Sequence, residues 1–300
     1  MATTARLVDE ITGESIQLEY DDNDPQWCIG PVITQSIDYG FAAPRVVQSN
    51  IPAANGTQDL TQFHADKTVT WQGWIKPTDD SPFPQLIWDK IRGLCAPNRR
   101  PWLYASEEGW NTERRMTLRA DSVTSPFDRA LGPIIVAGCV WKVPSGVMES
   151  ADLHQQQILI GGATGGYCIT KTGFCITGAN GLCLAGGQFG GATNVYNNGT
   201  VTTYPFITFT GPAKNPRVIN IQSKLGIYLN TTLSPNQLVV IDNRLKNVYE
   251  PAQPTPINRL SWYDFTRSSW LTLEQGANPF SYYSDDGLGT CSFSWRDRWT

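Results

Sequence analysis

Apolar and polar residues alternate most clearly between Val201 and Thr210. Val201, Ile207 and Phe209 fall on one face of this run, and the intervening positions are mostly threonine. This period of two is typical of a β-strand. A turn sequence, Asn-Asn-Gly at 197–199, precedes the run, and Gly211-Pro212 ends it. The pattern resumes at 217–221, so we interpret this stretch as the first strands of an all-β domain.

The same alternation continues to the end of the chain. Short runs of β-branched and aromatic residues recur at 225–229, 237–241, 247–249, 270–273 and 289–295. Turns separate them about every ten residues, and no helical period is present. The pattern therefore predicts a β-sandwich or jelly roll over residues 200–300.

Residues 1–154 combine strands with one helix. Alternating runs at 15–20, 32–37 and 67–75 predict strands, and the last places Val69, Trp71 and Gly73 on one face. A helix is expected at about 82–94, with Ser81 as N-cap, Pro82 in the first turn and an apolar stripe along its length. The members of that stripe are Ile87, Ile91 and Leu94. These elements predict an α+β domain over 1–154, and the whole chain is expected to be mainly β.

Between these domains, residues 155–199 read as an uncharged insert rich in glycine and cysteine. Gly161–Gly191 holds 11 of the 27 glycines, and Cys168, Cys175 and Cys183 stand seven and eight residues apart. A metal or redox cluster is one interpretation. The other is three short strands with the thiols on one face and bulky residues on the opposite face. We expect the second, and predict that the bulky face contacts another subunit or a partner. Its residues are Tyr167, Ile169, Phe174, Ile176, Leu182 and Leu184.

Charge and composition narrow the functional classes. The net charge of −4 argues against a surface that coats nucleic acid. The charge is uneven, because residues 1–154 carry −7, residues 155–204 carry +1 and residues 205–300 carry +2. Seven cysteines without a C-x-x-C pair indicate reduced, mostly buried thiols. No apolar run approaches the roughly 20 residues of a membrane span, and the first residues lack a signal peptide's apolar core. We therefore expect folding in a cytosol.

The sequence contains no recognisable catalytic motif. The two histidines, His64 and His154, adjoin no nucleophile motif, and no phosphate-binding or metalloprotease pattern occurs. We expect no enzyme activity, no metal and no cofactor. Sugar binding is the alternative function, because a β-sandwich with exposed aromatic rings can stack sugars. The residues considered for it are Trp262, Tyr263, Tyr282 and Tyr283, together with Asn215-Pro216-Arg217, which partly matches a galectin motif.

A set of short matches, in order along nearly the whole chain, resembles the distal tail proteins of long-tailed phages. The resemblance is strongest to the Dit-like minor tail proteins of siphoviruses that infect actinobacteria. The matches include Asn55-Gly56-Thr57, Trp141–Gly146, Asn197-x-Gly199-Thr200, Ile207–Gly211, Leu238–Asp242, Gln275-Gly276-x-Asn278 and Trp295–Trp299. Pro279, where the family usually has Asn, and the cysteine repeat depart from the pattern.

The resemblance implies an N-terminal split β-barrel with one helix, which forms a hexameric ring, and a galectin-like C-terminal β-sandwich. It implies a structural role in the virion, at the tail tip or baseplate. The ring would join the tail tube protein to the tail-tip hub protein and to receptor-binding or fibre proteins. DNA would only pass through its channel, whose wall we expect to be acidic because residues 1–154 are acidic.

Overall fold

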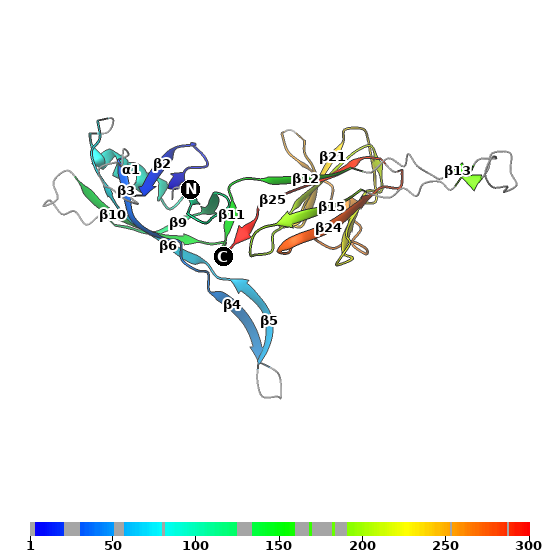
Figure 1. The fold of residues 1–300 in the computed structure, drawn as a ribbon, viewed down its shortest axis with the longest axis horizontal. Helices are drawn as coiled ribbons and strands as arrows, with labels where there is room; N and C mark the ends of the chain where they lie inside the picture. The colour runs from blue at the N-terminus through cyan, green and yellow to red at the C-terminus, as the bar shows by residue number, and fades with distance from the viewer. Residues whose placement is uncertain are drawn as a thin grey trace. The chain divides into compact units, whose positions relative to one another are not determined.

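The computed structural model describes residues 4–20, 31–50, 57–79, 82–124, 134–159, 168–169, 182–183, 191–252, 254–286 and 288–300. The chain divides into two compact units (Figure 1). Unit 1 comprises Met1–Asp152 and Arg298–Thr300, and unit 2 comprises Leu153–Asp297.

This division differs from the boundaries expected from the sequence. Two strands of the range taken as an insert, β12 (His154–Leu159) and β15 (Ala192–Asn197), belong to the sheets of unit 2. The last three residues of the range taken as the C-terminal domain belong to unit 1. Both sets of residues are assigned to their units because they pair with strands that are distant in the sequence. A local sequence pattern contains no information about such pairing.

Unit 1 is built on a ten-stranded sheet, in the order β26-β11-β8-β7-β1-β2-β3-β6-β10-β9. Of the pairs between described strands in this sheet, β2–β3 is parallel and the others are antiparallel. The strands are β1 (Thr4–Val8), β2 (Ser15–Tyr20), β3 (Val32–Asp38), β6 (Lys67–Ile75), β7 (Trp102–Ser106), β8 (Arg114–Thr117), β9 (Arg119–Thr124), β10 (Ile135–Val143), β11 (Met148–Ser150) and β26 (Arg298–Trp299). A separate two-stranded ribbon, β4 (Pro44–Asn50) with β5 (Thr57–His64), lies in the chain between β3 and β6 (Figure 1).

The alternation of large apolar and smaller or polar residues along the strands determines which face of this sheet is buried. In β6 and β10 every second residue is buried, and the register places Val69 opposite Trp141 and Trp71 opposite Cys139. The Trp71 indole donates a hydrogen bond to Thr34 Oγ1 (2.9 Å), which satisfies its buried N–H. The predicted strand at 67–75 and its inward face are confirmed.

Helix α1 (Pro84–Leu94) packs on β10 and β6. It begins two residues after the predicted start, since Pro84 rather than Pro82 occupies the first turn and Phe83 is the N-cap. The stripe of Ile87, Ile91 and Leu94 is buried as predicted. The apolar stripe therefore predicted the buried face of the helix correctly. The predicted N-cap, Ser81, was wrong, because the N-cap is Phe83.

Unit 2 is a β-sandwich. One sheet has six strands in the order β12-β25-β16-β21-β22-β23, and the other has four in the order β15-β24-β18-β19. The strands not yet given are β16 (Phe206–Thr210), β18 (Arg217–Asn220), β19 (Gly226–Tyr228), β21 (Leu238–Asp242), β22 (Asn247–Glu250), β23 (Ile257–Asn258), β24 (Gly276–Tyr283) and β25 (Thr290–Trp295). Unit 2 also contains a short pair, β17 (Ala213–Lys214) with β20 (Thr232–Leu233).

Aromatic contacts join the two sheets of unit 2. Phe209 stacks on Tyr282 (5.7 Å between ring centroids), and Phe280 packs against Phe293 (4.7 Å). Buried Asn243 connects a loop to this core, since its amide donates to a carbonyl of the 201–205 segment (2.7 Å) and accepts the Leu271 N–H (2.8 Å). Among the described residues there is one α-helix and the strands pair mainly antiparallel, so the predicted mainly β fold is confirmed.

The end of the chain is fixed to unit 1. β26 pairs with β11, with Met148 opposite Trp299. The Arg114 guanidinium lies 4.1 Å from the centre of the Trp299 ring and 4.1 Å from that of Trp110. Two such cation–π contacts on one side chain hold the last strand in place.

Candidate functional site

The predicted contact residues of the glycine- and cysteine-rich segment fall mostly outside the described residues. Two of them, Ile169 and Leu182, lie opposite each other where β13 (Cys168–Ile169) pairs with β14 (Leu182–Cys183). Cys168 is likewise opposite Cys183. Tyr167, Phe174, Ile176 and Leu184 lie outside the described part of the chain. A contact role for these six residues stays a prediction.

The aromatic residues considered for sugar binding are less exposed to solvent than the sequence suggested. Tyr263 and Tyr282 are buried in the sandwich core. Trp262 is packed against that core, and the Arg259 guanidinium lies 4.5 Å from its ring centre. Tyr283 is half-buried, with the Arg217 guanidinium 5.7 Å from its ring centre. Own-chain contacts therefore occupy much of the stacking surface that a sugar would need.

The galectin-like triplet forms an ion pair of its own. Asn215 Nδ2 donates to Asp285 Oδ2 (2.8 Å), and Arg217 Nη1 donates to Asp285 Oδ1 (2.6 Å). These hydrogen bonds, that from Asn215 first and then that from Arg217, hold the pKa of Asp285 below its usual value. The cluster lies at the surface, so its groups can also meet an external polar ligand.

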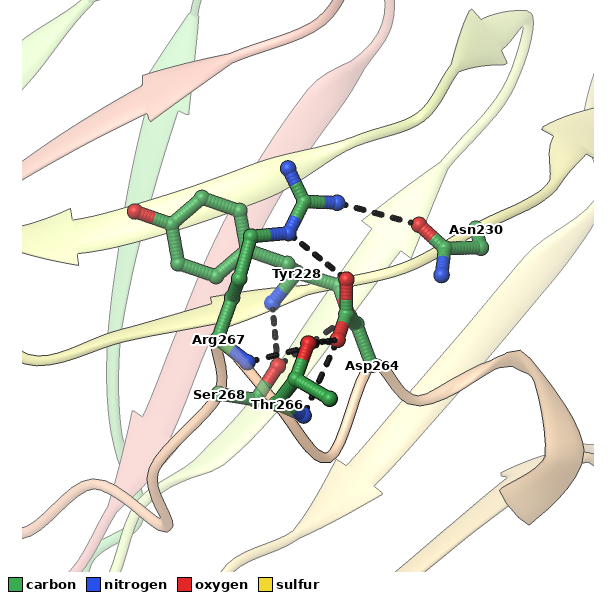
Figure 2. Close-up of polar contacts among 6 residues, drawn as sticks. All are labelled: Tyr228, Asn230, Asp264, Thr266, Arg267 and Ser268. Atoms are coloured by element: carbon green, nitrogen blue, oxygen red, sulfur yellow. Dashed lines mark hydrogen bonds and ion pairs between the residues drawn. The ribbon is translucent and has the colours of Figure 1, made fainter.

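A tight turn around Asp264 is a polar site of unit 2 held by several hydrogen bonds. Figure 2 shows the Asp264 carboxylate at its centre, facing Thr266 and Arg267. Oδ1 accepts hydrogen bonds from the Thr266 N–H (3.0 Å) and hydroxyl (2.6 Å), and Oδ2 accepts one from Arg267 Nε (2.6 Å). The Thr266 hydroxyl, followed by Arg267, holds the pKa of Asp264 well below its usual range. The carboxylate thus stays charged and fixes the turn.

Further contacts tie this turn to strand β19 (Figure 2). The Ser268 hydroxyl accepts the Tyr228 N–H (2.9 Å) and donates to the Tyr228 carbonyl (3.2 Å). Arg267 Nη2 donates to Asn230 Oδ1 (3.2 Å), and its guanidinium lies 5.0 Å from the centre of the Tyr228 ring. The turn is therefore held at several points.

The fixed turn presents an exposed aromatic residue. Phe265 is 64% exposed, and its ring meets Tyr263 edge-on with centroids 5.0 Å apart. Tyr263 in turn stacks on Trp270 at 4.5 Å and 9°. An exposed ring on a rigid support loses little entropy on binding, which suits it to anchor a protein partner. We call residues 263–268 the Phe265 turn.

Sequence reasoning missed the Phe265 turn. Its signal is the Asp-x-Thr spacing at 264–266, since an aspartate accepts hydrogen bonds from the residues two and three positions later. The sequence instead suggested Trp262 and Tyr263 as exposed aromatic residues. Tyr263 is buried, so it cannot contact a ligand at the surface.

Unit 1 has its own exposed surface on the outward side of β6 and β10. Trp74 is 39% exposed and lies directly opposite Val136 in the adjacent strand. Val140 and Thr70, also opposite each other, are half-buried on the same side. We call these four residues the Trp74 face. It is uncharged, and beside it β9 is an edge strand among the described strands. Such a face with an open edge suits association with another chain.

Groups for metal or proton chemistry are sparse in the described parts of the chain. There, no cluster of three or more His, Cys, Asp or Glu side chains could hold a metal ion. His154 contacts Asp297 (3.2 Å), whose carboxylate also accepts the Trp295 indole N–H (3.1 Å). None of the helices described there is both long and apolar enough to cross a membrane.

Comparison with known proteins finds a family match within residues 198–299 and a structural likeness that covers both units. Residues 198–299 match the family of Siphovirus-type tail component, C-terminal domain. No curated protein sequence matches the chain. Among solved structures, the chain is similar to SPP1 Dit (gp 19.1), described as a paradigm of the hub adsorption apparatus in phages infecting Gram-positive bacteria. That likeness has 10% identity and a TM-score of 0.59, and it covers 100% of both chains.

The chain is also similar to a component of the phage P2 baseplate in its activated conformation with Ca. The identity is 12% and the TM-score 0.51, over 99% of this chain and 98% of the other. The structure with Sr gives the same TM-score at 11% identity. These likenesses establish the fold across both units. The chain thus has the fold seen in SPP1 Dit, and its residues 198–299 match the model of the siphovirus-type tail component, C-terminal domain.

Proposed function

We propose that this protein is a structural distal tail protein that forms a hexameric ring at the tip of a phage tail. In this role the ring joins the tail tube to the tail-tip hub and the receptor-binding apparatus. The observation that carries the proposal is the likeness to SPP1 Dit, which covers 100% of both chains and so includes both units in order. Assembly in the host cytoplasm is part of the same proposal, and DNA passes through the ring without specific contact.

The Trp74 face and the open edge of β9 supply surfaces for ring formation. A closed ring needs a contact between two different patches of neighbouring subunits. The Trp74 face offers an uncharged, partly apolar patch, and the β9 edge offers unpaired backbone groups. Burying Trp74 and Val136 against a neighbour would stabilise the contact through their apolar area.

Mass photometry of the purified protein, alone and with tube and hub proteins, tests this assignment. Trp74→Glu and Val136→Glu place a charge on the Trp74 face and should abolish the hexamer. Leu245→Glu is the matched control, since Leu245 is 75% exposed in unit 2 and far from this face in the sequence. A hexamer that persists in both face variants would exclude this face. Absence of any hexamer of the wild type, both alone and with tube and hub proteins, would overturn the ring.

The six residues of the glycine- and cysteine-rich segment form a second part of the proposal. Tyr167, Ile169, Phe174, Ile176, Leu182 and Leu184 would pack across a subunit or partner boundary, because a bulky apolar face next to many glycines gains order from an external surface. Hydrogen exchange distinguishes the outcomes. Protection of 161–191 only in the assembly supports the contact role, whereas slow exchange in a verified monomer makes the segment an ordinary part of unit 2.

Sugar binding by unit 2 is the alternative function. The surface cluster of Asn215, Arg217 and Asp285 beside Tyr283 is where a sugar hydroxyl could be hydrogen-bonded. Pull-down of the wild type and of Arg217→Ala with host cell walls tests it. Retention that depends on Arg217 supports sugar binding, and retention that is equal for both proteins or absent contradicts it at this site.

A further inference from the structure

Two cysteines of the glycine- and cysteine-rich segment occupy directly opposed positions of a β-ribbon. The strands β13 and β14 are antiparallel, and their register places Cys168 opposite Cys183 and Ile169 opposite Leu182. Opposed residues of an antiparallel pair lie on the same face of the ribbon, and successive residues lie on opposite faces. The two cysteines therefore share one face, and Ile169 and Leu182 share the other.

The backbone spacing at this position suits a disulfide. Directly opposed Cα atoms of an antiparallel pair are about 4.5 or 5.5 Å apart, depending on whether the two residues exchange backbone hydrogen bonds. A disulfide joins Cα atoms that are about 4.4–6.8 Å apart, so either spacing lies within its range. Cys168 and Cys183 can therefore be joined without a shift of the backbone.

The ribbon has little support of its own. β13 and β14 have two residues each, and neither pairs with a third strand among those that the structure describes. A two-stranded hairpin alone is marginally stable in water. The glycines around it, 11 of them in Gly161–Gly191, add to the entropy that is lost when the segment becomes ordered. A cross-link between the two strands would restrict the unpaired chain and so favour the paired form.

We propose that Cys168 and Cys183 form a disulfide that closes this ribbon when the protein meets an oxidising environment. The oxidant is a small-molecule disulfide. The thiolate of one cysteine attacks it, which breaks its S–S bond, gives a mixed disulfide and releases one small thiolate. The thiolate of the other cysteine then attacks the protein sulfur of the mixed disulfide, so the Cys168–Cys183 bond forms and a second small thiolate leaves. The leaving thiolates take up the two thiol protons. Two protein thiols are oxidised and one small disulfide is reduced.

The environment and the position of the bond set its role. A cytosol keeps such thiols reduced, whereas an oxidising exterior permits the bond. The bond lies on the face opposite Ile169 and Leu182, so it leaves the proposed contact of those two residues unchanged. The proposal concerns this ribbon alone and does not depend on ring formation. The thiols described elsewhere in the chain are buried, which makes them slow to react and useful as internal references. They are Cys95, Cys139 and Cys291.

Peptide mapping of the full chain tests the proposal. The protein is incubated with oxidised or with reduced glutathione, its remaining thiols are alkylated, and it is digested with trypsin without reduction. Trypsin cleaves after Lys171, so Cys168 leaves in one peptide and Cys175 and Cys183 leave in the next. We expect these peptides to be linked after oxidised glutathione, with a mass lower by two hydrogen atoms, and separate after reduced glutathione. Alkylation or glutathionylation of Cys168 and Cys183 without linkage would overturn the proposal.

Variants identify the linked pair and provide a control. In Cys175→Ser, Cys183 is the only cysteine of the second peptide, and the linkage to Cys168 should persist. In Cys183→Ser the linkage should be lost. Cys291→Ser, which removes a buried thiol of unit 2, should link as the wild type does. Linkage that is lost in Cys175→Ser and kept in Cys183→Ser would assign the bond to Cys175 and overturn the proposal. Should a variant fail to fold, fragmentation of the linked wild-type peptides in the mass spectrometer locates the bond and decides.

Discussion

Lys67 places a buried charge in unit 1 without a compensating partner. It opens β6 on the same face as Val69 and Trp71, and it is 1% exposed. Its Nζ has no hydrogen-bond partner among the described residues, and the nearby Arg114 guanidinium carries the same charge. Burial, with a smaller effect of Arg114, lowers the pKa of Lys67 from the 10.5 of an exposed lysine to about 8.

The free-energy cost follows from this pKa. Each tenfold change in a protonation equilibrium corresponds to about 1.4 kcal/mol, so the charged lysine destabilises unit 1 by about 3 kcal/mol at neutral pH. The unfolded chain keeps the ordinary pKa and binds more protons than the folded chain between pH 8 and 10.5. The contribution of Lys67 to the free energy of unfolding therefore rises with pH across that window. Lys67→Met should stabilise unit 1 by up to about 3 kcal/mol at pH 7, and the gain should shrink towards pH 10.

Urea denaturation of the full chain at pH 7, 8, 9 and 10 measures this effect as the difference between variant and wild type. Lys90→Met, on the exposed side of α1, is the matched control and should change the free energy of unfolding by less than about 0.5 kcal/mol. The unit 2 transition is an internal reference. A Lys67→Met protein less stable than the wild type at pH 7, or a difference that is constant with pH, would refute the reasoning.

Four further predictions concern unit 2 and the ring. Asn243→Ala removes two buried hydrogen bonds and should lower the free energy of unfolding of unit 2 by about 2–4 kcal/mol in urea, whereas no change would show that water replaces the amide. Asp264→Asn should destabilise unit 2 at pH 7 but progressively less below pH 4, because the stabilisation from a lowered carboxyl pKa is lost on protonation; an effect independent of pH would contradict this. A fragment of residues 153–297 should unfold cooperatively, and one of 200–300, which lacks β12 and β15, should aggregate or melt without a transition. In a reconstruction of the ring, the channel wall should be net negative, and a positive wall would contradict the link to the −7 of residues 1–154.

Local patterns predicted those parts of the fold in which neighbouring residues carry the information. The inward face of β6 and the buried stripe of α1 followed from periods of two and about 3.6, because large apolar residues recur at those spacings. The start of α1 was less certain, since Pro82 and Pro84 both suit a first turn and only packing selects between them.

Long-range strand pairing and side-chain geometry could not be predicted from local sequence patterns. The return of Trp299 to β11 and its contact with Arg114 join residues far apart in the sequence. The hydrogen bond from the Trp141 indole to Cys95 Sγ (3.2 Å) likewise depends on how α1 packs on β10. The Phe265 turn was detectable in part, because Asp264-x-Thr266 is a turn signal, but the exposure of its ring depends on the stack beneath it.

Negative-stain electron microscopy of the purified full-length protein tests the central claim most directly. Class averages should show a closed ring with sixfold symmetry around a central channel, and the Trp74→Glu protein should give only single subunits. Particles that remain monomeric at high concentration, and that form no ring when tube and hub proteins are added, would contradict the account.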